Sequence, residues 1–185
     1  MLIQPQTKRL KLRQWQKADR EPFAALNADP DVMEFFPATL QRCESDAMAD
    51  QCRALIAARG WGFWATELLR SGEFIGFVGL HIPSLALPFS PCVEIGWRLA
   101  KPHWGQGYAT EAATRALQVG FEELEVPEIV SFTSSGNRRS RAVMERIGMT
   151  KTEQSFEHPG VPQGHPLRKH CLYRISRKDW ANKIA

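Results

Sequence analysis

The hydrophobic positions in the N-terminal part of the chain change from a strand-like to a helical spacing. Leu10 and Leu12 alternate with charged residues, which predicts a first strand closed by Trp15. Residues 18–27 then show a helical pattern. Two prolines interrupt residues 28–37, so we expect an apolar loop there instead of a continued helix.

A longer helix and a hairpin are predicted next. The helix covers residues 41–59, and Gly60 is placed to end it. Its apolar face is formed by residues at i, i+4, i+7 and i+8: Met48, Cys52, Leu55 and Ile56. Residues 61–68 and 74–82 are rich in strand formers and are joined by a short turn, which predicts a hairpin. The second run is apolar on both faces, so it belongs in a sheet that is covered on both sides.

The C-terminal half predicts strands around two further helices. A proline-rich loop over residues 83–91 leads to a strand over residues 92–100. Residues 107–124 fit the helical template at every apolar position, and their Ala and Gly residues predict close packing on the sheet. The remaining predicted elements are a strand over 128–133, a helix over 137–147, and strands over 149–156 and 167–175. This order indicates an α/β chain with a mixed sheet flanked by helices.

Length and composition narrow the class of protein. With 185 residues, of which 43% are hydrophobic and 24% charged, the chain matches one globular domain, expected over residues 1–185. No apolar run approaches the roughly 18 residues of a membrane span, and residues 1–13 lack the apolar stretch of a signal peptide. We therefore expect a cytoplasmic protein with no membrane partner.

Cysteine spacing and charge exclude several kinds of site. The four cysteines lie far apart with no C-x-x-C pair, which predicts reduced thiols and no bound metal. The net charge of +4 comes from 24 basic residues interleaved with 20 acidic ones. That balance favours an anionic small ligand over a nucleic-acid surface. A basic RNA-binding module is the rival interpretation, but no aromatic RNA-binding motif supports it.

A glycine-containing loop between a strand and the clearest helix is the strongest chemical signal. Gly105 and Gly107 precede the helix, whose first N–H groups and dipole favour a phosphate group. The P-loop motif is absent. The dinucleotide fingerprint requires a third glycine, and that position holds Thr110. A loop that binds the pyrophosphate of coenzyme A remains.

Three motifs, in order along the chain, resemble the GNAT acyltransferases, and within them the ribosomal-protein N-acetyltransferase (RimJ/RimL-type) branch. The motifs are EIGW at 94–97, WGQGYATEA at 104–112 and NRRSRAVMERIGM at 137–149. The resemblance implies a GNAT fold with a mixed, mostly antiparallel central sheet. It also implies acetyl-CoA as cosubstrate and an amine acceptor, either a protein N-terminus or a small molecule. One position departs from the family pattern, since Trp104 stands where the loop usually begins with Gln or Arg.

The resemblance also implies which residues bind the coenzyme. The backbone of residues 95–99 would pair with the pantetheine arm and polarise the thioester carbonyl. The glycine loop would hold the pyrophosphate. The expected cofactor-binding residues are Ile95, Trp97, Leu99, Trp104, Gly105, Gln106, Gly107, Tyr108, Ala109, Thr110, Asn137, Arg139 and Ser140. The cluster Arg138, Arg139 and Arg141 would meet the 3′-phosphate or form a solvated helix start.

Four residues are candidates for proton transfer. Glu94 lies on an apolar strand where burial would raise its pKa, so it is the first choice as base; the alternative is an ion pair with Arg98. Glu157 and His158 are the other candidates, with Glu157 near the substrate. Ser140 matches the family's proton donor to the departing thiolate, or it occupies the first turn of a helix capped by Asn137.

Two further questions stay open at this point. The apolar loop 85–89 could line an acceptor pocket or form a homodimer contact. An acyl-CoA-binding regulatory protein without turnover is the alternative to an enzyme.

Overall fold

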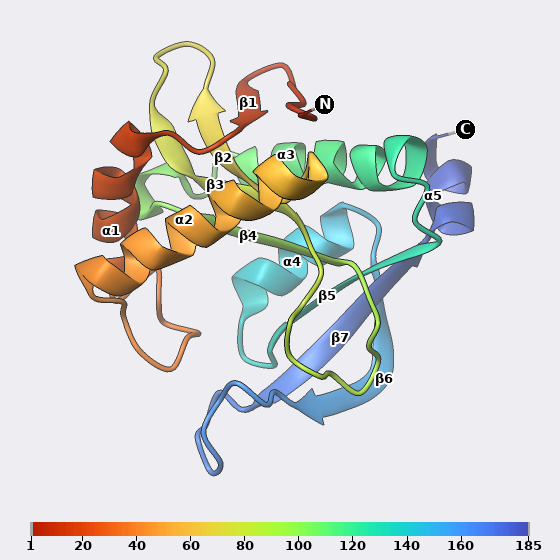
Figure 1. The fold of residues 1–185 in the computed structure, drawn as a ribbon. Coiled ribbons are helices and arrows are strands. Elements are labelled where there is room, and N and C mark those ends of the chain that lie inside the picture. Colours follow the sequence, from red (N-terminus) through yellow and green to blue (C-terminus); the bar gives the residue numbers. More distant parts are fainter. Residues whose placement is uncertain (1, 185) are drawn as a thin grey trace.

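The strands of the computed structural model, which describes residues 2–184, form a seven-stranded sheet in the order β1-β2-β3-β4-β5-β7-β6 (Figure 1). All neighbours are antiparallel except β4 and β5, which are parallel. The strands are β1 (Leu10–Arg13), β2 (Phe63–Leu68), β3 (Phe74–His81), β4 (Glu94–Leu99), β5 (Glu128–Ser134), β6 (Thr150–Glu157) and β7 (Lys169–Ser176). The predicted mixed, mostly antiparallel sheet and the hairpin β2–β3 are confirmed.

Helices cover both faces of this sheet. The helices are α1 (Arg20–Ala28), α2 (Arg42–Arg59), α3 (Tyr108–Gln118), α4 (Arg138–Arg146) and α5 (Arg177–Ile184). Figure 1 shows α2 crossing in front of the sheet and α3 lying behind it. Alternate residues of β3 explain the two faces: Phe77 packs on Phe23 of α1, whereas Leu80 lies near Gly120 on the α3 side. The expected double burial of β3 is therefore confirmed.

Helix α3 lies close to the sheet because its inner face carries small side chains. Ala112, Ala113 and Ala116 are completely buried. The predicted helix over residues 107–124 differs in one respect, since α3 ends at Gln118 and continues as a π-helical turn over Val119–Glu123. None of the described helices is long and apolar enough to cross a membrane.

Helix α5 was missed by the hydrophobic pattern. The Ser176 hydroxyl donates to Asp179 over 2.6 Å and accepts from its N–H over 3.1 Å, so these residues cap the helix start. Trp180 is 4% exposed and packs against Phe121 with ring centroids 5.8 Å apart. A single buried aromatic residue in an eight-residue helix produces no hydrophobic repeat that the sequence could show. The Ser-x-x-Asp spacing at 176–179, however, is a signal for the start of a helix.

The parallel strands β4 and β5 separate soon after they meet. A single register pair joins them in the described chain, Glu94 with Val130. The Val130 N–H donates to Val93 O over 2.9 Å, and the Ser131 hydroxyl donates to Ile95 O over 2.9 Å. Beyond Ile95, the edge of β4 that faces β5 is open, which leaves strand backbone groups available to a ligand.

Candidate active site

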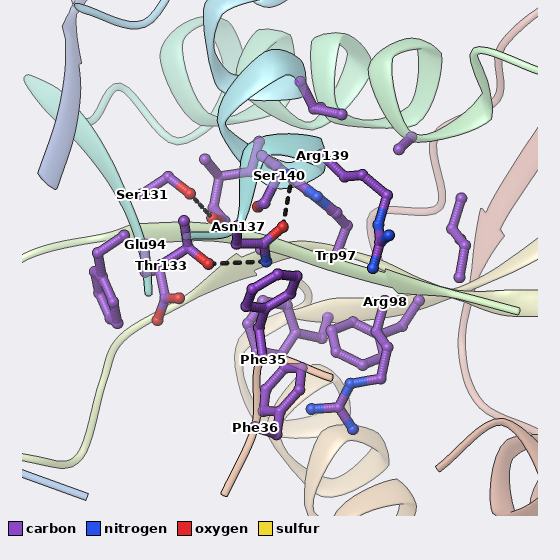
Figure 2. A pocket seen from close by; sticks show the side chains of 18 of the residues that line it. Phe35, Phe36, Glu94, Trp97, Arg98, Ser131, Thr133, Asn137, Arg139 and Ser140 are labelled. Carbon is purple, nitrogen blue, oxygen red and sulfur yellow. Dashed lines mark hydrogen bonds between the residues drawn. The ribbon is translucent and has the colours of Figure 1, made fainter. Parts of the chain in front are cut away.

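The opening between β4 and β5 leads into a cavity of about 1390 Å³ that has walls on both faces of the sheet (Figure 2). On the α3 side the walls come from the glycine loop and the start of α4. On the α2 side they come from the loop between α1 and α2, from β2 and β3, and from the chain after β3. The cavity therefore has two halves, one on each side of β4.

The glycine loop is shaped by two residues in the left-handed region. Gly105 and Gly107 have φ values of 73° and 79°, which side chains disfavour. Gly107 directly precedes α3, and no side chain caps the helix there. The first N–H groups of a helix lack partners within it, so they remain available to an anion that enters this end of the cavity.

Arg9 holds the glycine loop against α3. Its Nε lies 2.6 Å from Glu111 Oε2, and its Nη1 donates to Gln106 O over 3.0 Å. The guanidinium also lies over the Tyr108 ring, 4.5 Å from the centroid. Sequence reasoning missed Arg9 and Glu111 because they are 102 positions apart and belong to no shared motif.

Trp104, where the motif was expected to begin with Gln or Arg, has a structural role. Its indole N–H donates to Leu99 O at the end of β4 over 2.8 Å. The Arg139 guanidinium lies over the Trp104 ring at 4.6 Å and pairs with Glu34 at 2.5 Å. Trp104 thus ties the strand to the loop and provides a surface for a basic side chain.

The start of α4 brings Ser140 to the cavity. Asn137 caps the helix, since its Oδ1 accepts from the Ser140 N–H over 3.1 Å, and its Nδ2 donates to Thr133 Oγ1 over 3.0 Å. Figure 2 shows Asn137 between these two partners. Both ends of the Asn137 amide are therefore engaged, whereas the Ser140 hydroxyl has no hydrogen bond to residues 2–184 and lines the cavity.

Glu94 places a carboxyl group at the opening between β4 and β5. Protein surrounds its side chain on most sides, although part of it is reachable from the cavity. Burial raises the pKa of Glu94 to about 8. The alternative expectation, an ion pair between Glu94 and Arg98, is wrong. Residues four apart on a strand have Cα atoms about 13 Å apart. Arg98 instead donates to Asn27 Oδ1 over 2.6 Å.

The acetyltransferase (GNAT) domain family matches residues 9–150 of the chain. The chain belongs to the GNAT family. It is 32% identical to the FsC-acetyl coenzyme A-N(2)-transacetylase of Aspergillus fumigatus over 186 residues, which cover 94% of this chain and 76% of that protein. It resembles the crystal structure of an acetyltransferase from Agrobacterium tumefaciens str. C58, with a TM-score of 0.75, 31% identity and 95% of each chain covered.

The ribosomal-protein branch is also represented among the relatives of this GNAT chain. YdaF of Bacillus subtilis (strain 168), which is named as a ribosomal N-acetyltransferase, is 37% identical over 113 residues that cover 61% of this chain and 59% of that protein. The resemblance inferred from the three motifs is therefore confirmed at the level of the family and its GNAT fold.

Most of the predicted site residues of this GNAT domain line one cavity. Those that do are Glu94, Ile95, Trp97, Leu99, Trp104, Gly105, Gly107, Tyr108, Ala109, Thr110, Asn137, Arg139 and Ser140. Two do not. The Gln106 side chain turns back to Pro102 O, to which it donates over 3.0 Å. Glu157 is 71% exposed and pairs with Arg168 at 2.9 Å.

The half of the cavity on the α2 side, called the acceptor half below because we propose that the acceptor binds there, combines residues that the sequence analysis did not select, Phe36 and Phe63, with residues that it did consider. Phe63 stacks on His81 with ring centroids 5.0 Å apart, and Phe36 lies over Arg98. His158 also lines the cavity, and burial, the neighbouring His170 and Arg168 lower its pKa. Leu85 and Leu87, from the loop expected to form an acceptor pocket or a homodimer contact, line the cavity.

The site of this GNAT domain fits the coenzyme that the family uses, acetyl-CoA. Side chains are absent at Gly105 and Gly107, where a pyrophosphate would approach the backbone. A Cβ atom at Gly107 would lie 3.5 Å from Arg9 Nη2, between the loop and a cation. The exposed guanidinium of Arg138 and the stacked one of Arg139 add positive charge to the same half of the cavity.

Proposed function

We propose that this acetyltransferase moves the acetyl group of acetyl-CoA to a primary amine by direct attack. The observation that carries the proposal is the position of Glu94, whose raised-pKa carboxyl lies where β4 and β5 separate and lines the same cavity as the glycine loop. A carboxyl group with a pKa near neutrality can accept a proton from an ammonium group and release it to solvent.

The two proton-transfer groups approach the opening from opposite faces of the sheet. Glu94 extends toward the α2 side, where an amine would enter, and takes a proton from it directly or through a water molecule. Ser140 stands on the α3 side at the start of α4 and donates a proton to the sulfur that leaves. This arrangement supports a position of the acetyl thioester, which the coenzyme supplies, between acid and base.

The backbone of β4 would polarise the thioester carbonyl. Its edge beyond Ile95 lacks strand pairing to β5, so N–H groups there are free to donate to an oxygen that gains negative charge. The glycine loop and the first turn of α3 would hold the pyrophosphate, with Arg139 near the 3′-phosphate. Asn137 then positions Ser140 through its cap and need not contact the pantetheine arm itself.

Relatives support both acceptor classes that the sequence left open. The name of one gives FsC as the acetylated molecule, and the name of another refers to ribosomal acetylation. These names support the proposal that the acceptor is a primary amine on a small molecule or at a protein N-terminus.

The decisive experiment measures release of the coenzyme thiol from acetyl-CoA with a panel of small amines and N-terminal peptides. We expect amine-dependent thiol release and a stoichiometric amide product detected by mass spectrometry. Glu94→Gln should lose this activity while retaining coenzyme affinity. Tight acetyl-CoA binding without amine-dependent release from any member of the panel would instead support an acyl-CoA-binding regulator.

A further inference from the structure

Arg98 is a buried cation without a counter-charge in the wall of the acceptor half. It is 9% exposed and lines the cavity. Its Nη1 donates to the neutral amide of Asn27, and its Nε has no acceptor in residues 2–184. Arg98 takes part in none of the ion pairs formed among residues 2–184. Figure 2 shows the side chain extending from β4 toward Phe36.

A second buried arginine shows how this protein normally satisfies such a group. Arg13 is 4% exposed, and its two Nη atoms donate to the Asp19 carboxylate over 2.7 and 2.8 Å. Its Nε donates to Glu67 over 2.5 Å. Arg13 lies away from the cavity and has two carboxylates, whereas Arg98 lies in the cavity wall and has none.

The surroundings of Arg98 only partly compensate for its burial. Phe36 and Phe77 lie 4.2 and 5.5 Å from the guanidinium and supply weak cation–π attraction. Burial nevertheless lowers the pKa of Arg98 to about 10. A buried charge that lacks a partner is unfavourable compared with an apolar residue of similar volume. The site is therefore incomplete without an anion.

The geometry of β4 places this cation in line with the proposed base. Glu94, Gly96 and Arg98 are alternate residues of the strand and share the face that looks toward α2. The Phe63 ring packs closely over Gly96 between the other two residues: a Cβ atom at Gly96 would lie 3.2 Å from that ring and 3.7 Å from Glu94 Oε1. The Cα atoms of Glu94 and Arg98 are about 13 Å apart. Glu94, Arg98 and the Phe63 ring between them all line the cavity, so a molecule that lies along this ring can present its amine to Glu94 and its other end to Arg98.

We propose that Arg98 binds a carboxylate of the acceptor, so that the preferred substrates are primary amines with a carboxylate several bonds away from the amine. The proposal rests on the proposed acetyltransferase function and names its substrate class. A single guanidinium between aromatic rings matches one negative charge and the planar, two-oxygen geometry of a carboxylate. A phosphate dianion would require further donors, whereas the side chains around the guanidinium are Phe36, Phe77 and Met48.

Matched pairs of amines test the proposal through a ratio of rates. For 6-aminohexanoate and hexylamine, and for shorter and longer homologues, we expect the wild type to have a kcat/KM about 10- to 100-fold higher with the carboxylated member. In Arg98→Met this ratio should fall to about one. Arg98→Lys should keep part of the preference, because lysine keeps the positive charge but lacks the two parallel N–H donors of a guanidinium. A wild-type ratio near one at every chain length, or a ratio unchanged in Arg98→Met, would overturn the proposal.

A second variant gives Arg98 a carboxylate partner from within the protein. In Asn27→Asp, a carboxylate replaces the amide whose Oδ1 lies 2.6 Å from Arg98 Nη1. The Ser45 hydroxyl, which lies 2.9 Å from Asn27 Nδ2, can donate to the second carboxylate oxygen. Arg98 stays in place, so its packing role is preserved. We expect the preference for carboxylated amines to decrease as in Arg98→Met. Arg13→Lys is the matched control, and it should leave the ratio at its wild-type value.

Product binding separates this proposal from the proposed function. Calorimetry with coenzyme A present compares 6-acetamidohexanoate with N-hexylacetamide and requires no turnover. Tighter binding of the acid to the wild type but not to Arg98→Met supports the carboxylate site, even if no amine were acetylated and the proposed function failed. Amine acetylation without any difference between acid and neutral product, in rate or in binding, would leave the function standing and remove the role of Arg98.

Discussion

The two halves of the cavity are built in different ways. The coenzyme half comes from two continuous segments, the strand, loop and helix over residues 94–112 and the start of α4, and it offers mainly backbone N–H groups. The acceptor half combines side chains from several segments that are far apart in the sequence, including Phe36, Phe63, Phe77, Arg98 and His158. A ligand common to a whole family can be bound by backbone geometry, whereas a particular acceptor needs particular side chains.

Glu94 stands at the boundary between these halves, and its loss should have the largest effect. Glu94→Gln keeps the shape of the side chain but cannot accept a proton, so we expect kcat/KM to fall by about 10²- to 10⁴-fold. In the wild type, kcat/KM should rise with pH until about 8, where the carboxyl group is ionised. A pH–rate profile of the variant should lack this acidic limb.

Glu157→Gln is the comparison that tests this assignment. Glu157 is paired with Arg168 outside the cavity, so the variant should keep the wild-type profile and acceptor KM. If Glu157→Gln lost the rate and the acidic limb while Glu94→Gln kept both, the two roles would have to be exchanged.

A substitution at Ser140 should change the rate of the reaction and not the affinity for the coenzyme. Ser140→Ala removes the proton donor for the departing thiolate, and kcat should fall roughly 10- to 10³-fold with nearly unchanged coenzyme affinity. The hydroxyl of Ser135 serves as control, since it donates to Lys169 O outside the cavity and Ser135→Ala should keep wild-type kcat. Equal kcat for Ser140→Ala and the wild type would assign Ser140 to the helix start alone.

The same contrast explains what could be predicted from the sequence. Gly105, Gly107 and Asn137 act through local backbone geometry, so the order of residues alone indicated their place. Arg98 and Asn27 meet across 71 positions, and only packing of α1 against the sheet brings them together. The position of Glu157 was expected near the substrate, but β6 is an edge strand whose Glu157 carboxylate points to solvent and to Arg168.

Gly107 tests whether backbone shape carries coenzyme affinity. Gly107→Ala adds a side chain at a φ of 79°, so the loop should shift away from the pyrophosphate path. We expect at least about a tenfold loss of coenzyme affinity, or about 1.4 kcal/mol, by calorimetry. Gly72→Ala introduces the same strain at a φ of 70° in an open turn between β2 and β3 and should not affect binding. Unchanged affinity in folded Gly107→Ala would reject the loop assignment.

The smallest effect concerns stability, and it arises from Glu94 in the empty protein. Burial raises the pKa of Glu94 from its ordinary value of 4.5 to about 8, so the folded chain holds this proton more firmly than the unfolded chain. Below pH 4.5 both states are protonated and the site has no effect on the free energy of unfolding. Between pH 4.5 and 8 the unfolded state binds fewer protons, so this site lowers stability as pH rises, and above pH 8 the loss is complete.

Glu94→Gln should therefore gain stability relative to the wild type as the pH increases. Urea unfolding of both proteins without coenzyme, at pH 5 and pH 9, should show a larger difference in favour of the variant at pH 9. The exposed Glu157 provides the matched carboxylate, and Glu157→Gln should not show this pH-dependent gain because its side chain is 71% exposed. If the free energies of unfolding of Glu94→Gln and the wild type changed with pH in parallel, the Glu94 carboxyl group would be solvated. Its pKa would then not be raised by burial, and the argument that Glu94 is the base would fail.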